Sequence, residues 1–183
     1  MTVEDKLGNI RRSRGYSYEH TLVKRLNHGL WVARRLGGSS TGLPDIVAVN
    51  NKDATLLSIE AKSGTGDALY VLPDQLHRCL LVRDMFGYYK IKHVILAFKF
   101  MRKKRFTRKK QVIYEKRRLV EYYKIADKLN RLDSIPIVKC TYTGSTFLMR
   151  NGKFIKKSLP NYVMPFNTIH VRNGNGPEEL VSE

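Results

Sequence analysis

Within the first hundred residues, the apolar positions follow helical spacing in two places. Between residues 17 and 27, Leu22 and Leu26 fall on one stripe of a helix, and Ser17 suits the N-cap. Between residues 73 and 85, leucines recur at helical spacing after a proline, which is favoured at the first position of a helix. The pattern therefore predicts helices over residues 17–27 and 73–85.

Four other segments are rich in β-branched and aliphatic residues and are bounded by turn-forming residues, as strands are. These predicted strands cover residues 30–34, 46–49, 55–62 and 93–100. The order helix, three strands, helix, strand predicts a small α/β core that is complete by about residue 100.

The flanking segments differ in composition from this core. The N-terminal segment is polar and basic, so we expect a flexible arm there, and the last residues are rich in Gly, Asn and Glu, which predicts a disordered tail. The segment after the core is basic, and its pattern predicts a helix over residues 119–132 and strands over residues 135–142 and 145–149. The expected organisation is an arm (1–16), a core (17–100), a basic α/β extension packed on the core (101–172) and a tail (173–183).

The charge balance favours a polyanionic partner. Lys and Arg number 34 against 16 Asp and Glu, which gives a net charge of +18 and a pI near 10.1. On charge alone, the partner is a nucleic acid, an acidic protein or an anionic membrane. No apolar run approaches the roughly 20 residues that span a bilayer, and the N-terminus lacks the character of a signal peptide, so we expect no membrane association. Cys79 and Cys140 form no CxxC pair, which indicates reduced thiols in a cytoplasmic protein without a zinc site.

One predicted strand carries an acid and the strand before it directly follows one, at positions suited to binding a cation. Side chains alternate between the faces of a strand, so Glu60 and Lys62 share one side of the strand at 55–62. Asp45 stands immediately before the preceding strand. Buried ionised groups are costly unless they are paired or bind a metal, and Mg²⁺ prefers hard oxygen ligands. The pattern therefore predicts a Mg²⁺ site that activates a water for attack on a phosphodiester, where Lys62 orients or deprotonates that water or offsets charge on the phosphate.

Each of these residues also has a plain structural interpretation. Glu-x-Lys is common in strands, and Asp45, which follows a proline, suits a turn. Glu19 lies on or beside the stripe of the first helix, where it completes the outer sphere of a metal or is an acid favoured by the helix dipole. The glycine-rich residues 37–42 form a plain loop, or they approach the scissile phosphate through the Ser39 hydroxyl and exposed amides. The order in which these features follow one another favours the catalytic interpretation.

That order resembles the PD-(D/E)xK nuclease superfamily and, more narrowly, the archaeal Holliday junction resolvases. The resemblance covers about residues 15–100 and rests on Gly15-x-x-x-Glu19, Val32-Ala33-Arg34 with Gly38-Ser39, Pro44-Asp45-Ile46-Val47-Ala48, Ile59-Glu60-Ala61-Lys62, Leu69-Tyr70-Val71 and Gln75. It implies a restriction-endonuclease-like mixed β-sheet core flanked by helices, here with a basic C-terminal extension. It also implies a homodimer that uses Mg²⁺, or Mn²⁺ in its place, to nick two strands of a four-way junction symmetrically.

By matching position, the resemblance implies a role for each motif residue. Asp45 and Glu60 would be the metal ligands, Glu19 a support for the metal, Lys62 the catalytic lysine, Ser39 a phosphate contact, Arg34 a DNA contact and Gln75 a supporting polar residue.

Basic residues cluster in two segments that we expect to follow DNA phosphates, although a solvated basic linker is the alternative for the second. The chain has no helix-turn-helix signature, so we expect recognition of backbone and shape. The expected DNA contacts are Arg11, Arg12, Arg14, Arg34, Lys103, Lys104, Arg105, Arg108, Lys109 and Lys110.

The sequence thus predicts a metal-dependent endonuclease that resolves Holliday junctions by paired symmetric nicks during recombination and repair. One alternative keeps the chemistry and changes the DNA substrate, as in a restriction, repair or mobile-element endonuclease. The other is a non-enzymatic basic DNA-binding protein. Whether a replication or recombination protein is a further partner is left open.

Overall fold

The computed structural model describes residues 3–37, 42–108, 111–131 and 134–167, with side chains described for 15–37, 42–107, 112–129 and 134–167. In chain order, its elements are α1 (Val3–Leu26), β1 (Trp31–Arg35), β2 (Ile46–Asn50), β3 (Thr55–Gly64), β4 (Ala68–Val71), α2 (Pro73–Met85), β5 (Ile91–Phe100), β6 (Lys103–Arg108), β7 (Gln111–Lys116), β8 (Val120–Ile125), the 3-10 helix η1 (Asp127–Arg131), β9 (Val138–Thr141), β10 (Thr146–Arg150) and β11 (Lys153–Lys156).

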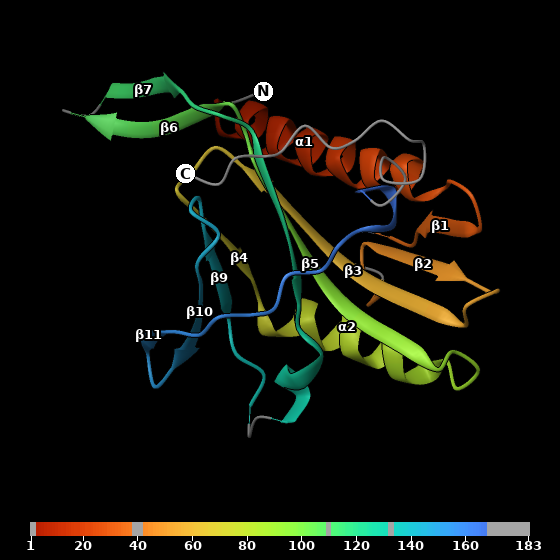
Figure 1. The fold of residues 1–183 in the computed structure, drawn as a ribbon. Coiled ribbons are helices and arrows are strands. Elements are labelled where there is room, and N and C mark those ends of the chain that lie inside the picture. The colour runs from red at the N-terminus through yellow and green to blue at the C-terminus, as the bar shows by residue number, and fades with distance from the viewer. Residues whose placement is uncertain (1–2, 38–41, 109–110, 132–133, 168–183) are drawn as a thin grey trace, which may run out of the picture.

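The centre of the molecule is a mixed five-stranded sheet in the order β1-β2-β3-β5-β8 (Figure 1). Strands β1, β2 and β3 form an antiparallel meander, β3 and β5 are parallel, and β8 returns antiparallel to β5. A parallel pair needs a crossover connection, and here β4 and α2 supply it. The mixed α/β fold with a sheet flanked by helices, which the sequence predicted, is confirmed.

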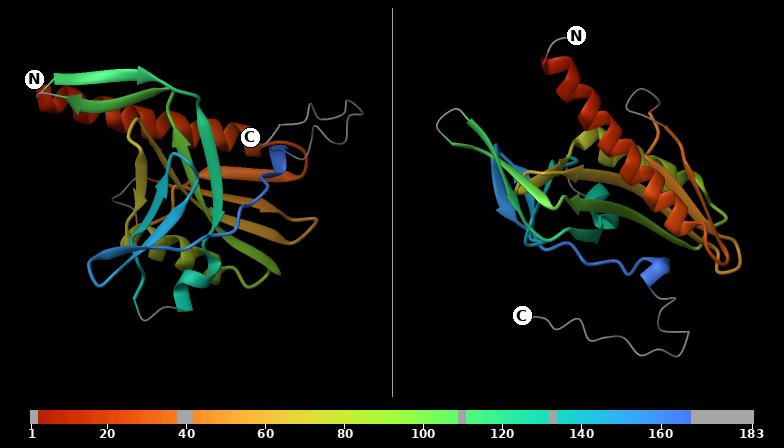
Figure 2. Two further views of the ribbon diagram at one scale, coloured as in Figure 1. Left: turned by 60° about the vertical axis from the view of Figure 1, so that its left-hand side comes forward. Right: turned by 90° about the horizontal axis from the view of Figure 1, so that it is seen from above.

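The two long helices cover opposite faces of this sheet (Figures 1 and 2). Tyr18 and Leu22 of α1 pack in one buried cluster with Ile59 and Ala61 of β3. Leu76 of α2 belongs to a second buried cluster on the other face. Side chains that alternate along β3 therefore face different helices, and this alternation decides where each site residue points.

A smaller sheet, in the order β11-β10-β9-β4, and a separate two-stranded hairpin, β6–β7, complete the fold. Val138, Cys140 and Leu148 of the smaller sheet are buried in the same cluster as Leu76 and Phe98. The expectation that the core is complete by about residue 100 is therefore wrong, because β8 is a strand of the central sheet and the later strands close one of its two hydrophobic clusters.

Helix α1 begins at Val3, whereas the sequence pattern predicted a start at Ser17 and a flexible arm before it. The extension contains no proline, and Glu4 and Asp5 stand in its first turn, where acids favour a helix through its dipole. Arg11, Arg12 and Arg14 are thus on helical backbone.

Residues 119–132 form no α-helix in their described part, contrary to the predicted helix. They form β8 followed by η1. The segment Val120–Ile125 is rich in aromatic and β-branched residues, and pairing with β5 buries Tyr123. Its strand is also tied to α1, because Arg25 and Glu121 form an ion pair of 2.7 Å. Here tertiary pairing outweighs the helical spacing of the sequence.

The other predicted elements match the structure closely. Helix α2 spans the predicted 73–85, and β1, β2, β3, β5, β9 and β10 overlap the predicted strands. Among the described residues, no helix combines the length and the apolar character that crossing a bilayer requires.

Candidate active site

Asp45 and Glu60 meet where β2 begins and β3 runs toward its end. The β2–β3 register pairs Ile46 with Ile59, so one further step places Asp45 opposite Glu60. The Oδ2 atom of Asp45 accepts a hydrogen bond of 2.8 Å from the backbone N–H of Ala61. This bond fixes the Asp45 carboxylate against β3, beside the two residues that flank Ala61.

Glu60 and Lys62 share one side of β3, as predicted. The Nζ atom of Lys62 lies 2.6 Å from Oε1 of Glu60. The Glu60 side chain is 1% exposed, whereas that of Lys62 is 23% exposed, so the ammonium group lies between a buried carboxylate and solvent. Burial raises the pKa of Glu60 to about 7 and the Asp45 charge acts in the same direction, while Lys62 partly offsets both.

The second carboxylate oxygen of Glu60, Oε2, is buried and has no hydrogen-bond partner among the described residues. Leaving a buried acceptor unsatisfied is costly, so such an atom indicates a missing ligand or a strained site. Glu60 faces α2, where the Arg78 side chain is 12% exposed and acts electrostatically to lower the pKa of Glu60. The Nε atom of Arg78 is also buried without a partner in the described part of the chain.

Glu19 approaches from the other side of the sheet. It lies on α1 and forms an ion pair with Nε of Arg35 in β1. Burial raises the pKa of Glu19, and the Arg35 hydrogen bond counteracts that effect. The charges of Asp45 and Lys62 also act on Glu19. The guanidinium of Arg35 in turn lies over the Tyr16 ring, 4.7 Å from its centroid.

The acids therefore do not form one cluster of three. Asp45 interacts electrostatically with both Glu60 and Glu19, which lie on opposite faces of the sheet. Within the described residues, no group of three or more His, Cys, Asp and Glu side chains is gathered closely enough to hold a metal ion. The pair that could serve as ligands is Asp45 with Glu60, because Oε2 of Glu60 is unsatisfied.

The remaining predicted residues have other positions. Arg34 is exposed on β1 and its Nη1 atom donates to the backbone carbonyl of Ala33 at 2.8 Å. Gln75 caps α2, where its Oε1 atom accepts the Leu72 N–H at 3.1 Å. Ser39, Lys109 and Lys110 lie outside the described residues, as do the side chains of Arg11, Arg12, Arg14 and Arg108.

Two basic residues near the acids, Arg35 and Arg78, were not identified from the sequence. Ala33 of β1 is buried in the cluster beneath α1, so the strand alternation also turns Arg35 toward α1 and Glu19. Strand alternation could have identified Arg35, because it lies on the same face of the strand as Ala33, whose burial would have had to be predicted first. Arg78 carried no such signal, because it lies on a second helix whose packing against β3 the sequence pattern does not specify.

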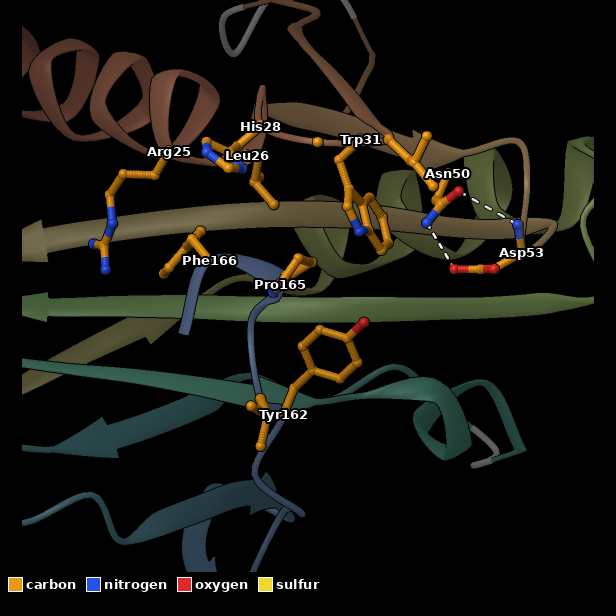
Figure 3. Close-up of a pocket in the computed structure, with 12 residues that line it drawn as sticks. Arg25, Leu26, His28, Trp31, Asn50, Asp53, Tyr162, Pro165 and Phe166 are labelled. Carbon is orange, nitrogen blue, oxygen red and sulfur yellow. Dashed lines mark hydrogen bonds between the residues drawn. The ribbon is translucent and has the colours of Figure 1, made fainter. Parts of the chain in front are cut away.

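A cavity of about 380 Å³ lies at the opposite end of the sheet (Figure 3). It is formed where α1 ends, where Trp31 pairs with Asn50, and where the C-terminal segment brings Tyr162 and Phe166 over the sheet. Its carboxylate, Asp53, is held within a turn by the Asn50 side chain at 2.8 Å. This cavity is therefore separate from the acids at the start of β2.

A mixed sheet that joins Pro-Asp at the start of one strand to Glu-x-Lys on its neighbour defines an α/β protein of the PD-(D/E)xK class. Over residues 10–139, the sequence matches the family model described as archaeal Holliday junction resolvase (Hjc). Because that match covers more than half of the sequence, the chain belongs to this family.

The structure is similar to that of Hjc from Archaeoglobus fulgidus, a Holliday junction resolvase from an archaeal hyperthermophile. The two have 23% sequence identity and a TM-score of 0.47, over 70% of this chain and 89% of that chain. Among proteins of curated function, none matches the sequence significantly.

Proposed function

We propose that this protein is a metal-dependent endonuclease that resolves four-way DNA junctions by paired nicks. Family membership supports the substrate, and the net charge of +18 suits a polyanion. The observation that carries the chemistry is the buried Glu60 carboxylate. One of its oxygens is bound by Lys62, the other has no hydrogen-bond partner among the described residues, and the group interacts electrostatically with Asp45.

Asp45 and Glu60 are the residues that would hold Mg²⁺ or Mn²⁺, with Glu19 as a support. Their carboxylates are hard oxygen ligands. The Oε2 atom of Glu60 is buried without a hydrogen-bond partner among the described residues, and a bound cation would satisfy it. When bound, such an ion supplies Lewis-acid stabilisation of the phosphate and of the attacking water. The hydrogen bond from Ala61 keeps Asp45 oriented toward this position.

Lys62 is the residue that orients the attacking water and offsets charge on the phosphate, because its ammonium group lies beside the buried Glu60 carboxylate. Its side chain reaches from the buried Glu60 carboxylate toward solvent, the side from which DNA would approach. Arg34, exposed on β1, would contact a DNA phosphate beside the site. The Arg11, Arg12 and Arg14 positions on α1 would extend the same basic surface.

Two such sites in a homodimer would cut strands of like polarity symmetrically, and the distance between them would select the junction. This arrangement would place the protein in recombination and repair. The cleavage reaction can be tested on a synthetic four-way junction labelled on each strand in turn, with Mg²⁺ present.

We expect wild type to give paired nicks near the branch point, and we expect Asp45→Asn and Glu60→Gln to bind the junction without cutting it. Lys153→Gln, at an exposed position of β11 in the smaller sheet, serves as the control and should still cut. Wild-type rates in either acid variant would overturn the assigned roles. Cleavage of linear duplex at a fixed sequence would instead indicate an endonuclease with another substrate.

A further inference from the structure

The β6–β7 hairpin continues two strands of the central sheet. Strands β5 and β8 pair up to Phe100 and Val120, and the hairpin pairing begins at Lys103 and Lys116. Between these pairs, two residues (101 and 102) on one strand face three (117, 118 and 119) on the other. One extra residue on one strand bends and twists a ribbon, as a β-bulge does. The hairpin therefore leaves the plane of the sheet and projects from the body (Figures 1 and 2).

The base of the hairpin is fixed to the turn that follows Lys62. The backbone N–H of Arg105 donates to the carbonyl of Thr65 at 3.0 Å, and that of Met101 donates to Gly64 at 2.8 Å. The Arg117 side chain, 8% exposed, donates to the carbonyls of Met101 and Gly66 at 2.9 Å each. Because β3 carries Glu60 and Lys62 and ends in this turn, the hairpin is held in a defined position relative to the candidate active site.

The two faces of the hairpin differ in charge. Residues directly opposite one another in an antiparallel pair share a face, so Lys103, Lys116, Arg105 and Tyr114 lie together. We call these four residues the basic face. In the described part of the chain, none of its three cations pairs with a carboxylate, and Tyr114 is 54% exposed.

The opposite face is partly neutralised. It carries Lys104 opposite Glu115, and Phe106 opposite Ile113. The Nζ atom of Lys104 is 2.9 Å from Oδ2 of Asp67, so this lysine ties the hairpin to the body. The sequence predicted that both neighbouring lysines contact DNA, but their environments differ. Lys103 makes no ion pair in the described part of the chain, whereas Lys104 is paired with Asp67, so we no longer expect Lys104 to contact a phosphate.

We propose that the basic face binds the backbone of a duplex arm of the DNA as that arm enters the active site. The proposal rests on the proposed function and adds to it a docking surface and an orientation. A two-stranded ribbon has the width that a DNA groove admits, and the unpaired cations suit phosphates. The N-terminal half of α1 projects on the same side of the molecule and splays away from the hairpin in the view from above (Figure 2). The DNA would approach between these two projections.

The test is the salt dependence of junction binding, measured by fluorescence anisotropy with EDTA present so that no cutting is needed. Each phosphate contact contributes about 0.9 to the slope of log K against log salt concentration. We expect Lys103→Gln, Arg105→Gln and Lys116→Gln each to flatten the slope by about that amount. Lys104→Gln is the matched control, since it removes the same charge from the other face of the same strand, and it should leave the slope nearly unchanged.

Equal effects of Lys103→Gln and Lys104→Gln would overturn the proposal, as would an unchanged slope in all four variants. Tyr114→Ala should weaken binding without changing the slope, and Tyr114→Phe should restore it, because the ring packs against the nucleic acid without charge. A wild-type protein that shows these slopes and yet never cuts with Mg²⁺ would refute the proposed function and leave the docking surface standing. Wild-type binding to an acidic protein with no salt-dependent binding to DNA would refute the docking surface.

Discussion

At the scale of single residues, each of the three carboxylates near the start of β2 is held by a different contact. Glu60 is paired with Lys62, Asp45 is fixed by the Ala61 amide, and Glu19 is paired with Arg35. The strand alternation predicted the Glu60–Lys62 contact, because it depends only on two positions of one strand. It did not predict that Glu19 and Glu60 lie on opposite faces, since that depends on which helix covers which face.

The raised pKa of Glu60 predicts a pH-dependent stability. Burial raises the folded-state pKa from 4.5 to about 7, so the folded protein binds a proton more tightly than the unfolded chain does. The stabilisation is fully present below pH 4.5 and is lost as the pH rises through about 7. It amounts to on the order of 3 kcal/mol.

Urea denaturation in EDTA, at several values of pH between 4.5 and 8, measures this loss. Other groups titrate in the same range, so the quantity to compare is the difference in free energy of unfolding between wild type and Glu60→Gln. We expect the free energy of unfolding of wild type to fall relative to that of Glu60→Gln as the pH rises. A difference that stays constant across the range would show that Glu60 titrates normally.

At the scale of elements, the sequence predicted correctly those helices and strands that depend on residues close together in the chain. Helix α2 matches its predicted bounds because Pro73 and the spacing of its leucines specify it locally. Strand β8 was predicted as helix, because its pairing with β5 joins segments separated by the whole hairpin. The hairpin itself was predicted only as a basic run, since its apolar residues fall on both faces, Phe106 and Ile113 on one and Val112 and Tyr114 on the other, so the sequence shows no alternation.

Arg117 is the residue on which we expect the position of the hairpin to depend. Its nearly buried guanidinium binds two carbonyls and lies 4.5 Å from the centroid of the Tyr142 ring. Replacing it with Gln leaves these acceptors short of donors, so we expect a loss of about 1–3 kcal/mol in stability. We also expect faster hydrogen exchange at the β6 and β7 amides.

The exposed neighbour Arg118 is the control, because replacing it with Gln removes the same charge and leaves the described anchor contacts intact. Hydrogen–deuterium exchange of the two variants distinguishes anchoring from charge. If Arg118→Gln accelerates hairpin exchange as much as Arg117→Gln does, the anchoring role of Arg117 is wrong.

At the scale of the whole molecule, the central sheet is shared between the early and late parts of the chain. Val138, Cys140 and Leu148 pack against residues of α2 and β5, so the segment after residue 100 contributes to the fold that holds the acids. The proposed dimer lies at this scale too, because symmetric cutting requires two such folds with their sites at a fixed separation.

Mixing wild type with Glu60→Gln tests the dimer. If each protomer cuts one strand, mixed dimers should nick a junction once, and singly nicked products should accumulate as the share of the variant rises. Strand-specific labels on a cruciform plasmid separate one nick from two. Products that remain doubly nicked at every mixing ratio would indicate that one protomer makes both cuts.

The bulge at residues 101–102 and 117–119 has a consequence for how this chain can change over time. It lies between the central sheet, whose register positions the acids, and a ribbon whose described contacts with the body are at its base. Residue pairs can be added to or removed from the tip, or their charges altered, without shifting Asp45 or Glu60. The length and charge of the hairpin that we propose to bind DNA can therefore evolve separately from the candidate active site.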